Sequence, residues 1–294
     1  MKTTVVVGYD RTPSSERALT EAGREAVWRD AAVSIVHTFQ WVAATPPMIA
    51  VPMGVEQGLR EAAETVARAG ARRLRDRYPG MSVESQAVLG PAADTLAEAA
   101  RHAGLLLLGN RGRGGFAGLL LGSVSLRTLG YASCPTIIVR GPERAPADEI
   151  VLALDIEDPA DEVLDFAFAE ASRRDARLRV VNVWDLGWSV ALAPDADDDL
   201  EAAKARAVTE LYTGLQKVLS PWQAGHPEVR LDIEVAGGTP SAALVAASNH
   251  ADLVVVGAHR RTDGHQGMRL GPITQALLHH AECPIAVVPR GAAD

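Results

Sequence analysis

The feature that most constrains this chain is an internal repeat. Four short apolar segments of the first half return in the same order in the second half of the 294 residues. A repeat of this length is a whole folding unit, because each copy is long enough to bury a core of its own. We therefore predict two domains of one fold, residues 1–143 and 147–294, joined by a linker rich in Pro and Gly. The matching segments are 5–10 with 150–155, 33–38 with 178–183, 105–109 with 253–257, and 134–140 with 283–290.

Aliphatic strands alternate with helices within each half. The strands are continuous apolar runs, which indicates burial on both faces and hence a parallel sheet covered by helices. Right-handed crossovers then give an α/β protein with two tandem, doubly wound, Rossmann-like domains of five strands each. The last strand of each half is apolar, and we expect these two strands to pair, which would make the halves a pseudo-dimer. In the first half we predict strands over 4–9, 32–38, 82–88, 104–109 and 136–140, and helices over 14–29, 56–78, 92–102 and 123–132.

The composition disfavours several classes of function. The formal net charge is −8 and aromatic residues make up 4%, which argues against a nucleic-acid-binding surface. The sequence contains no apolar run of about 18 residues, so no membrane span is predicted. We expect no signal peptide either, because the opening MKTTVVVGYD leaves no room for its apolar region. Two lone cysteines, Cys134 and Cys283, are typical of a reducing compartment. We expect a cytoplasmic protein without nucleic-acid or membrane partners.

A glycine-rich segment follows the fourth strand of the first half. Residues 109–125 read GNRGRGGFAGLLLGSVS, and the segment opens the next helix. Successive amides in such a loop form an anion-binding concavity, and the unpaired first amides of a helix carry partial positive charge. Ser123 and Ser125 could add hydroxyl donors, and Arg111 or Arg113 could neutralise phosphate oxygens. Asp10, at the end of the first strand, lies at the same edge, so this edge is predicted to bind a phosphate-bearing ligand.

These residues also have other interpretations. The loop could be a plain connection, with Ser123 and Asp10 acting only as helix caps or turn residues. A Walker A loop is excluded, because the only lysines are Lys2, Lys204 and Lys217. The histidines lack metal-ligand spacing and no nucleophile elbow is present, so neither a metal site nor a catalytic residue is predicted. The Pro-rich loop 41–55 is interpreted as a lid, an intermolecular contact or an irregular crossover.

The spacing of the loop is specific enough to indicate a family. Gly109-x2-Gly112-x9-Gly122-Ser123 resembles the ATP-binding signature of the universal stress protein family, and nearly the whole chain resembles two copies of that domain. The resemblance implies ATP, with Mg²⁺ or without it, as the ligand; cyclic AMP is the alternative, since family members hold either. It also implies that Asp10 and Thr38 hold the adenosine end. The remaining implied contacts to ribose and phosphates are Gly109, Gly112, Gly122, Ser123, Val124 and Ser125.

The second half departs from this pattern. Arg260 replaces the second glycine, the spacer grows by one residue, and Pro272 replaces the serine. Proline is well tolerated at the first helical position. However, replacing serine by proline removes an amide donor and a hydroxyl from the anion-binding loop. We expect nucleotide binding here to be weak, different or absent. The corresponding candidate positions are Asp155, Val183, Gly257 and Gly271.

The leading hypothesis is a stress-response protein in which adenine-nucleotide occupancy alters conformation or partner choice. We expect no enzyme activity beyond slow ATP hydrolysis, because no general base is evident. The alternatives are a small-molecule enzyme on the same scaffold and a ligand-free interaction protein. Association of two chains into a homodimer is left open.

Overall fold

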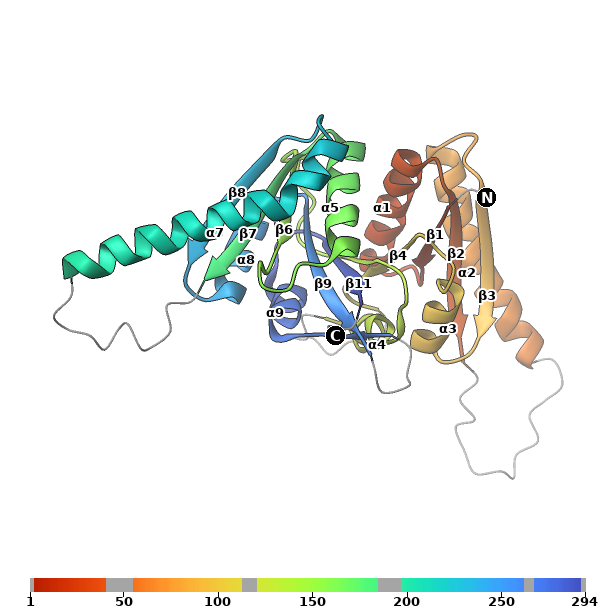
Figure 1. Ribbon diagram of the computed structural model, residues 1–294. Coiled ribbons are helices and arrows are strands. Elements are labelled where there is room, and N and C mark those ends of the chain that lie inside the picture. The colour runs from red at the N-terminus through yellow and green to blue at the C-terminus, as the bar shows by residue number, and fades with distance from the viewer. Residues whose placement is uncertain (1–2, 41–54, 113–120, 185–196, 262–266, 292–294) are drawn as a thin grey trace, which may run out of the picture. The chain divides into compact units, whose positions relative to one another are not determined.

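The computed structural model describes residues 3–40, 55–112, 121–184, 197–261 and 267–291 (Figure 1). The chain forms two compact units. The first comprises Met1–Arg140 with Arg260–Arg269, and the second comprises Gly141–His259 with Leu270–Asp294. The predicted lid loop 41–55 lies outside the described residues except for its last position. The predicted domain limits, 1–143 and 147–294, stay a prediction.

The first unit is built on five parallel strands in the order β3-β2-β1-β4-β5. The expected doubly wound α/β fold is confirmed for this half. A two-residue strand, β10 (Met268–Arg269), also belongs to the unit. The elements in chain order are β1 (Thr4–Gly8), α1 (Pro13–Arg29), β2 (Ala32–Phe39), α2 (Val55–Arg77), β3 (Val83–Leu89), α3 (Ala92–Ala99), β4 (Leu105–Gly109), α4 (Ser123–Tyr131) and β5 (Thr136–Val139).

The second unit repeats this topology, with the parallel order β8-β7-β6-β9-β11. The repeat therefore corresponds to two tandem copies of one α/β domain. The elements are β6 (Glu149–Ala153), α5 (Asp161–Arg174), β7 (Arg177–Trp184), α7 (Asp197–Gly225), β8 (Leu231–Gly237), α8 (Pro240–Ala247), the short 3₁₀ helix η1 (Ser248–His250), β9 (Leu253–Arg260), α9 (Pro272–His280) and β11 (Ile285–Arg290).

The central strands explain why the sheet is parallel and buried. Side chains of β1 and β4 are nearly inaccessible, as continuous aliphatic runs predict. In the first unit, α1 packs with α2 and α3 packs with α4, so each face of the sheet carries one helix pair (Figure 1). The order of strands reverses between β1 and β4, and in the second unit between β6 and β9. These are the switch points at which open α/β sheets bind ligands.

The repeat extends to the ends of helices. α1 and α5 both end at an aspartate in the left-handed conformation, Asp30 with φ 46° and Asp175 with φ 51°. In both places the next amide closes the helix by bonding five residues back, from Ala31 N to Ala26 O at 2.9 Å and from Ala176 N to Ala171 O at 3.0 Å. This is the Schellman arrangement, in which glycine is the usual left-handed residue.

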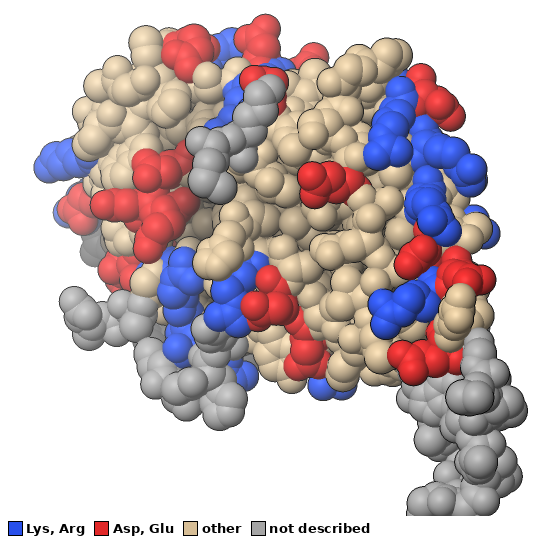
Figure 2. Space-filling view, turned by 90° about the vertical axis from the view of Figure 1, so that its right-hand side faces the viewer, with Lys and Arg blue, Asp and Glu red and all other residues tan. Residues whose placement is uncertain are grey.

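The segment between the repeats is anchored in the second unit. Arg144 donates to the carbonyl oxygens of Asn249 and Glu282, and Ala147 N donates to the carboxylate of Asp252. The expected pairing of the two last strands into a pseudo-dimer stays a prediction. Among the residues described, no helix is long and apolar enough to cross a membrane. Figure 2 shows Lys and Arg side chains beside Asp and Glu side chains on the face it draws.

Candidate functional site

Asp10 follows β1 at the switch point of the first unit. Its Oδ1 accepts hydrogen bonds from Thr12 N at 3.0 Å and from Thr12 Oγ1 at 2.6 Å. The next residue, Arg11, adopts φ 63°, a left-handed conformation that is uncommon for a residue with a Cβ. Backbone conformations of this kind are concentrated at functional sites. The carboxylate is thus fixed by its own turn, half-buried at the carboxyl edge of the sheet.

Gly112 lies against Asp10. A Cβ built on Gly112 would lie 3.2 Å from Asp10 Oδ2, so a larger side chain would crowd the carboxylate. A Cβ on Gly122 would lie 3.6 Å from Gly112 N, which brings the third glycine of the motif to the second. The structure therefore brings Asp10, Gly112 and Gly122 together, although they are far apart in the sequence.

Gly109 is required by close packing against α1. A Cβ there would lie 2.4 Å from Ser14 Oγ and 2.7 Å from the backbone carbon of Ser14. The chain then leaves the sheet: Asn110 N still donates to Val139 O at 3.1 Å, and Asn110 O accepts from Gly122 N at 2.7 Å. This last bond joins the two ends of the glycine loop. Residues 113–120 of the loop, which include the predicted Arg113, lie outside the described part of the chain.

The N-terminus of α4 opens at this loop. Its N-cap is Gly122, and no side chain caps the helix within the part of the chain that the structure describes. The first helical bond runs from Leu126 N to Gly122 O at 3.1 Å, so the amides of Ser123, Val124 and Ser125 precede the helical ladder. Ser123 and Val124 are exposed. Amides in this position attract an anion without further machinery.

Ser125 has a different environment from Ser123. It is buried, and its Oγ donates to Gly109 O at 2.7 Å. Its hydroxyl proton is therefore engaged inside the protein, where it ties α4 to the end of β4. Arg111 is exposed, and its amide donates to Ser14 Oγ at 3.2 Å. Contact of either residue with a ligand stays a prediction.

Thr38 lies near the carboxyl end of β2, the strand beside β1. Its neighbour His37 is buried, with Nδ1 2.7 Å from Tyr9 O. Because a carbonyl oxygen only accepts, Nδ1 carries the proton of this bond. The second unit has the same connection, from Asn182 Nδ2 to Leu154 O at 2.9 Å. These side chains fix the residue that precedes the aspartate in each unit.

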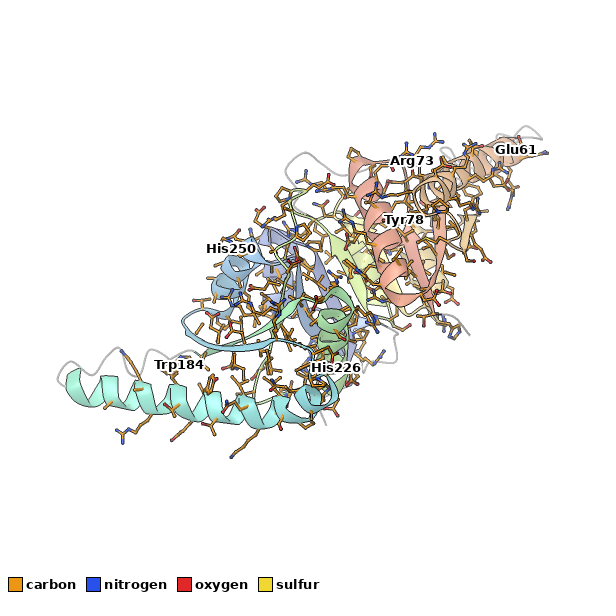
Figure 3. The ribbon with its side chains drawn as sticks, turned by 90° about the horizontal axis from the view of Figure 1, so that it is seen from above. Glu61, Arg73, Tyr78, Trp184, His226 and His250 are labelled. Atoms are coloured by element: carbon orange, nitrogen blue, oxygen red, sulfur yellow. The ribbon has the colours of Figure 1, made fainter. Side chains whose placement is uncertain are left out.

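A polar cluster next to Asp10 was not predicted from the sequence. Tyr9 OH donates to Glu16 Oε1 at 2.6 Å, and Arg73 of α2 forms an ion pair with the same carboxylate. Figure 3 labels Arg73 on this helix. Burial, followed by the bond to Glu16, raises the pKa of Tyr9 to about 12. No sequence signal identifies this cluster, because its members belong to three different elements.

Over the residues described, the second unit has a different geometry at the corresponding edge. β9 continues beyond Gly257 to Arg260, and its parallel pairing with β11 extends to Pro289 with Ala258 and Arg290 with His259. In the first unit the pairing of β4 with β5 stops at Gly109 and Val139. Residues 258–260, which correspond to the start of the glycine loop in the first unit, are therefore strand residues here. The segment Arg260–Arg269 is grouped with the first unit.

Charged side chains occupy the edge of the second sheet. The stem of Arg290 lies over Gly257, because a Cβ there would be 3.1 Å from Arg290 Cδ. Arg290 forms an ion pair with Asp158, and His259 Nε2 lies 3.3 Å from the same carboxylate. Asp155 is exposed, and its Oδ1 accepts from Glu157 N at 3.0 Å. Of the other candidates, Val183 lies in β7 and Gly271 is the N-cap of α9.

Two further expectations concern cysteine reactivity and metal binding. Burial raises the pKa of Cys134 to about 11, which keeps this thiol protonated near neutral pH. Among the described residues, no group of three or more His, Cys, Asp or Glu side chains could hold a metal ion. The predictions that the chain has no metal site and no catalytic residue stay predictions.

The fold and this edge define a class of protein: a tandem α/β protein with an uncapped helix N-terminus at the switch point of its first sheet. The model of the universal stress protein family matches residues 1–140 and again 147–289, so the chain belongs to that family. It is 32% identical to a universal stress protein of Mycolicibacterium smegmatis over 97% of both chains. It is also 32% identical to a universal stress protein of Mycobacterium tuberculosis over 96% of both chains.

The fold is also similar to a solved structure. The structure of a universal stress protein from Archaeoglobus fulgidus superposes on this chain with a TM-score of 0.69 and 18% sequence identity. The superposition covers 98% of each chain. At this identity the similarity shows the fold alone. The fold and family that the sequence indicated are thereby confirmed.

Proposed function

We propose that the first unit binds an adenine nucleotide, ATP, and that its occupancy regulates the protein in a stress response. One observation carries the proposal: the bond from Gly122 N to Asn110 O holds the uncapped N-terminus of α4 at the edge where Gly112 lies against Asp10. Open amides suit phosphate oxygens, and a fixed carboxylate suits ribose hydroxyls. Asp10 and Thr38 would face the adenosine end, and Ser123 and Val124 the phosphates.

We further propose that the protein acts by binding rather than by turnover. Oδ1 of Asp10 already accepts two bonds from Thr12, which disfavours Asp10 as a general base. Any hydrolysis of ATP would then be slow. Cyclic AMP is the competing ligand, since its single phosphate would also suit the helix N-terminus. A location in the cytoplasm and a further homodimer belong to this proposal as well.

Release of bound ligand tests the proposal. Freshly purified protein is denatured, and the supernatant is analysed by mass spectrometry for ATP, ADP and cyclic AMP. Titration of stripped protein with each nucleotide then gives the affinities. ATP bound more tightly than cyclic AMP supports the proposal, and the reverse order assigns the site to cyclic AMP. An empty protein that binds neither nucleotide excludes this function.

The chain offers a matched pair of variants. Ser123→Pro copies into the first unit the proline that stands at the start of α9, and Pro272→Ser makes the reverse change in the second. Proline suits the first helical position but removes an amide and a hydroxyl. We expect Ser123→Pro to weaken ATP binding by about tenfold or more, and Pro272→Ser to leave it unchanged. Equal affinities for both variants would contradict the assigned site.

A further inference from the structure

Ser14 joins the first turn of α1 to the glycine loop. Its side chain is buried, and its Oγ donates to Asn110 Oδ1 at 2.7 Å. The same Oγ accepts from Arg111 N at 3.2 Å. One hydroxyl group therefore satisfies both a side chain and an amide at the beginning of the loop, 96 and 97 residues further along the chain.

Other bonds close the same loop base. Ser125 Oγ holds Gly109 O from α4, and Gly122 N holds Asn110 O from the far end of the loop, each at 2.7 Å. Residues 109–111 are thus held from α1 on one side and from α4 on the other. Anchoring of this kind keeps the amides of residues 109–111 in place before a ligand arrives.

The turn that carries Ser14 also fixes Asp10. Thr12 bonds the carboxylate, and Ser15 Oγ accepts from Asp10 N at 3.2 Å. The first turn of α1 therefore connects the carboxylate at one end of the candidate site with the loop at the other. Gly112, which follows the anchored residues, lies against Asp10: a Cβ on it would be 3.2 Å from Asp10 Oδ2.

We propose that Ser14 is a positioning residue for the phosphate end of the nucleotide, an inference that rests on the proposed function. Ser14 acts through Asn110 and Arg111. The second unit has no such residue: with Asp30 and Asp175 aligned, α5 starts about one turn later than α1, and Pro159 stands at the position of Ser14. Gly257 instead lies under Arg290.

The test compares ligands with and without phosphates. Ser14→Ala leaves Asn110 Oδ1 and Arg111 N without this partner, which loosens the loop base. We expect the affinity for ATP to fall by about five- to tenfold and the affinity for adenosine to change by less than about twofold. Thr20→Ala is the control, because this hydroxyl bonds Glu16 O of its own helix, at 3.1 Å, rather than the loop. Titration calorimetry and competition with a fluorescent nucleotide give both affinities.

A second variant and a second readout keep the test decisive. Asn110→Ala removes the side chain that Ser14 bonds. The double variant Ser14→Ala/Asn110→Ala should lose less binding free energy for ATP than the sum of the losses in the two single variants. Hydrogen exchange of the peptide containing Arg111 should accelerate in Ser14→Ala but not in Thr20→Ala. If Ser14→Ala loses affinity for ATP and adenosine equally, or leaves hydrogen exchange of this peptide unchanged, the positioning role of Ser14 is refuted while the proposed function stands. Failure of the unaltered chain to bind ATP would instead refute the proposed function.

Discussion

At the scale of single residues, Gly109 is required by space rather than by backbone conformation. The glycines with positive φ in the described chain are Gly80, Gly90, Gly141, Gly238 and Gly267, and none belongs to the motif. Gly109 has the backbone of α1 within 2.7 Å of its absent Cβ. A positive φ therefore does not explain the glycine at 109, 112 or 122, whereas close approach of the backbone explains Gly109.

This close approach leads to a prediction about stability. Gly109→Ala should lower the free energy of unfolding by about 1–3 kcal/mol, because the methyl group overlaps atoms that cannot move aside. Gly58→Ala is the matched control: no atom lies within 4 Å of its Cβ, and the position is an exposed one in α2. That change should stabilise by about 0.5–1 kcal/mol. Urea unfolding followed by circular dichroism measures both, and equal midpoints would contradict the packing argument.

At the scale of elements, Tyr9 connects one strand to two helices. Its hydroxyl bonds Glu16 of α1, and its ring lies 3.0 Å from the position of a Cβ on Gly70 of α2. A larger residue at position 70 would crowd the ring of Tyr9. The buried phenol keeps its proton, with a pKa raised to about 12, so this packing is sensitive to alkaline pH.

The pH dependence has a definite sign. In the unfolded chain a tyrosine ionises near pH 10, whereas folded Tyr9 keeps its proton until about pH 12. Its contribution to stability is thus complete below about pH 10 and is lost as the pH rises from about 10 to 12. Tyr9→Phe should show a smaller loss of stability over this range than the unaltered chain, in urea unfolding at about pH 9 and about pH 11. If Tyr9→Phe loses as much stability between the two pH values as the unaltered chain, the role of Tyr9 is refuted. Tyr212→Phe is the control, because Tyr212 is an exposed residue of α7.

The sequence predicted most elements of the first unit to within a few residues, because continuous aliphatic runs identify buried parallel strands. It did not predict the continuation of β9 through Ala258 and His259, which read as part of a loop. The length of this strand is decided by its partner β11, and tertiary pairing of this kind overrides local pattern. Ser14 was missed for the same reason, since its partners lie in the loop after β4.

At the scale of the whole chain, two copies of one fold have unequal edges. The first sheet ends in a glycine loop and an uncapped helix. The second extends its strands to Arg260 and Arg290 and pairs Arg290 with Asp158. Amides of Ala258 and His259 lie in a strand ladder rather than a cradle. Duplication preserved the packing that both units need, including the left-handed aspartates, while the ligand-facing edge diverged.

The difference between the edges of the two sheets predicts that each chain binds one nucleotide. Titration calorimetry of the stripped full-length protein with ATP should give a stoichiometry of about one, because in the second unit Pro272 removes an amide from the start of α9 and the amides of Ala258 and His259 lie in a strand ladder. Ser123→Pro should weaken the measured binding by about tenfold or more, whereas Asp158→Ala, which releases Arg290 in the second unit, should leave the stoichiometry at about one, because the strand amides stay paired. Two nucleotides per chain, or a site of unchanged affinity in a Ser123→Pro variant that stays folded, would show that the second unit binds ATP despite its extended strands.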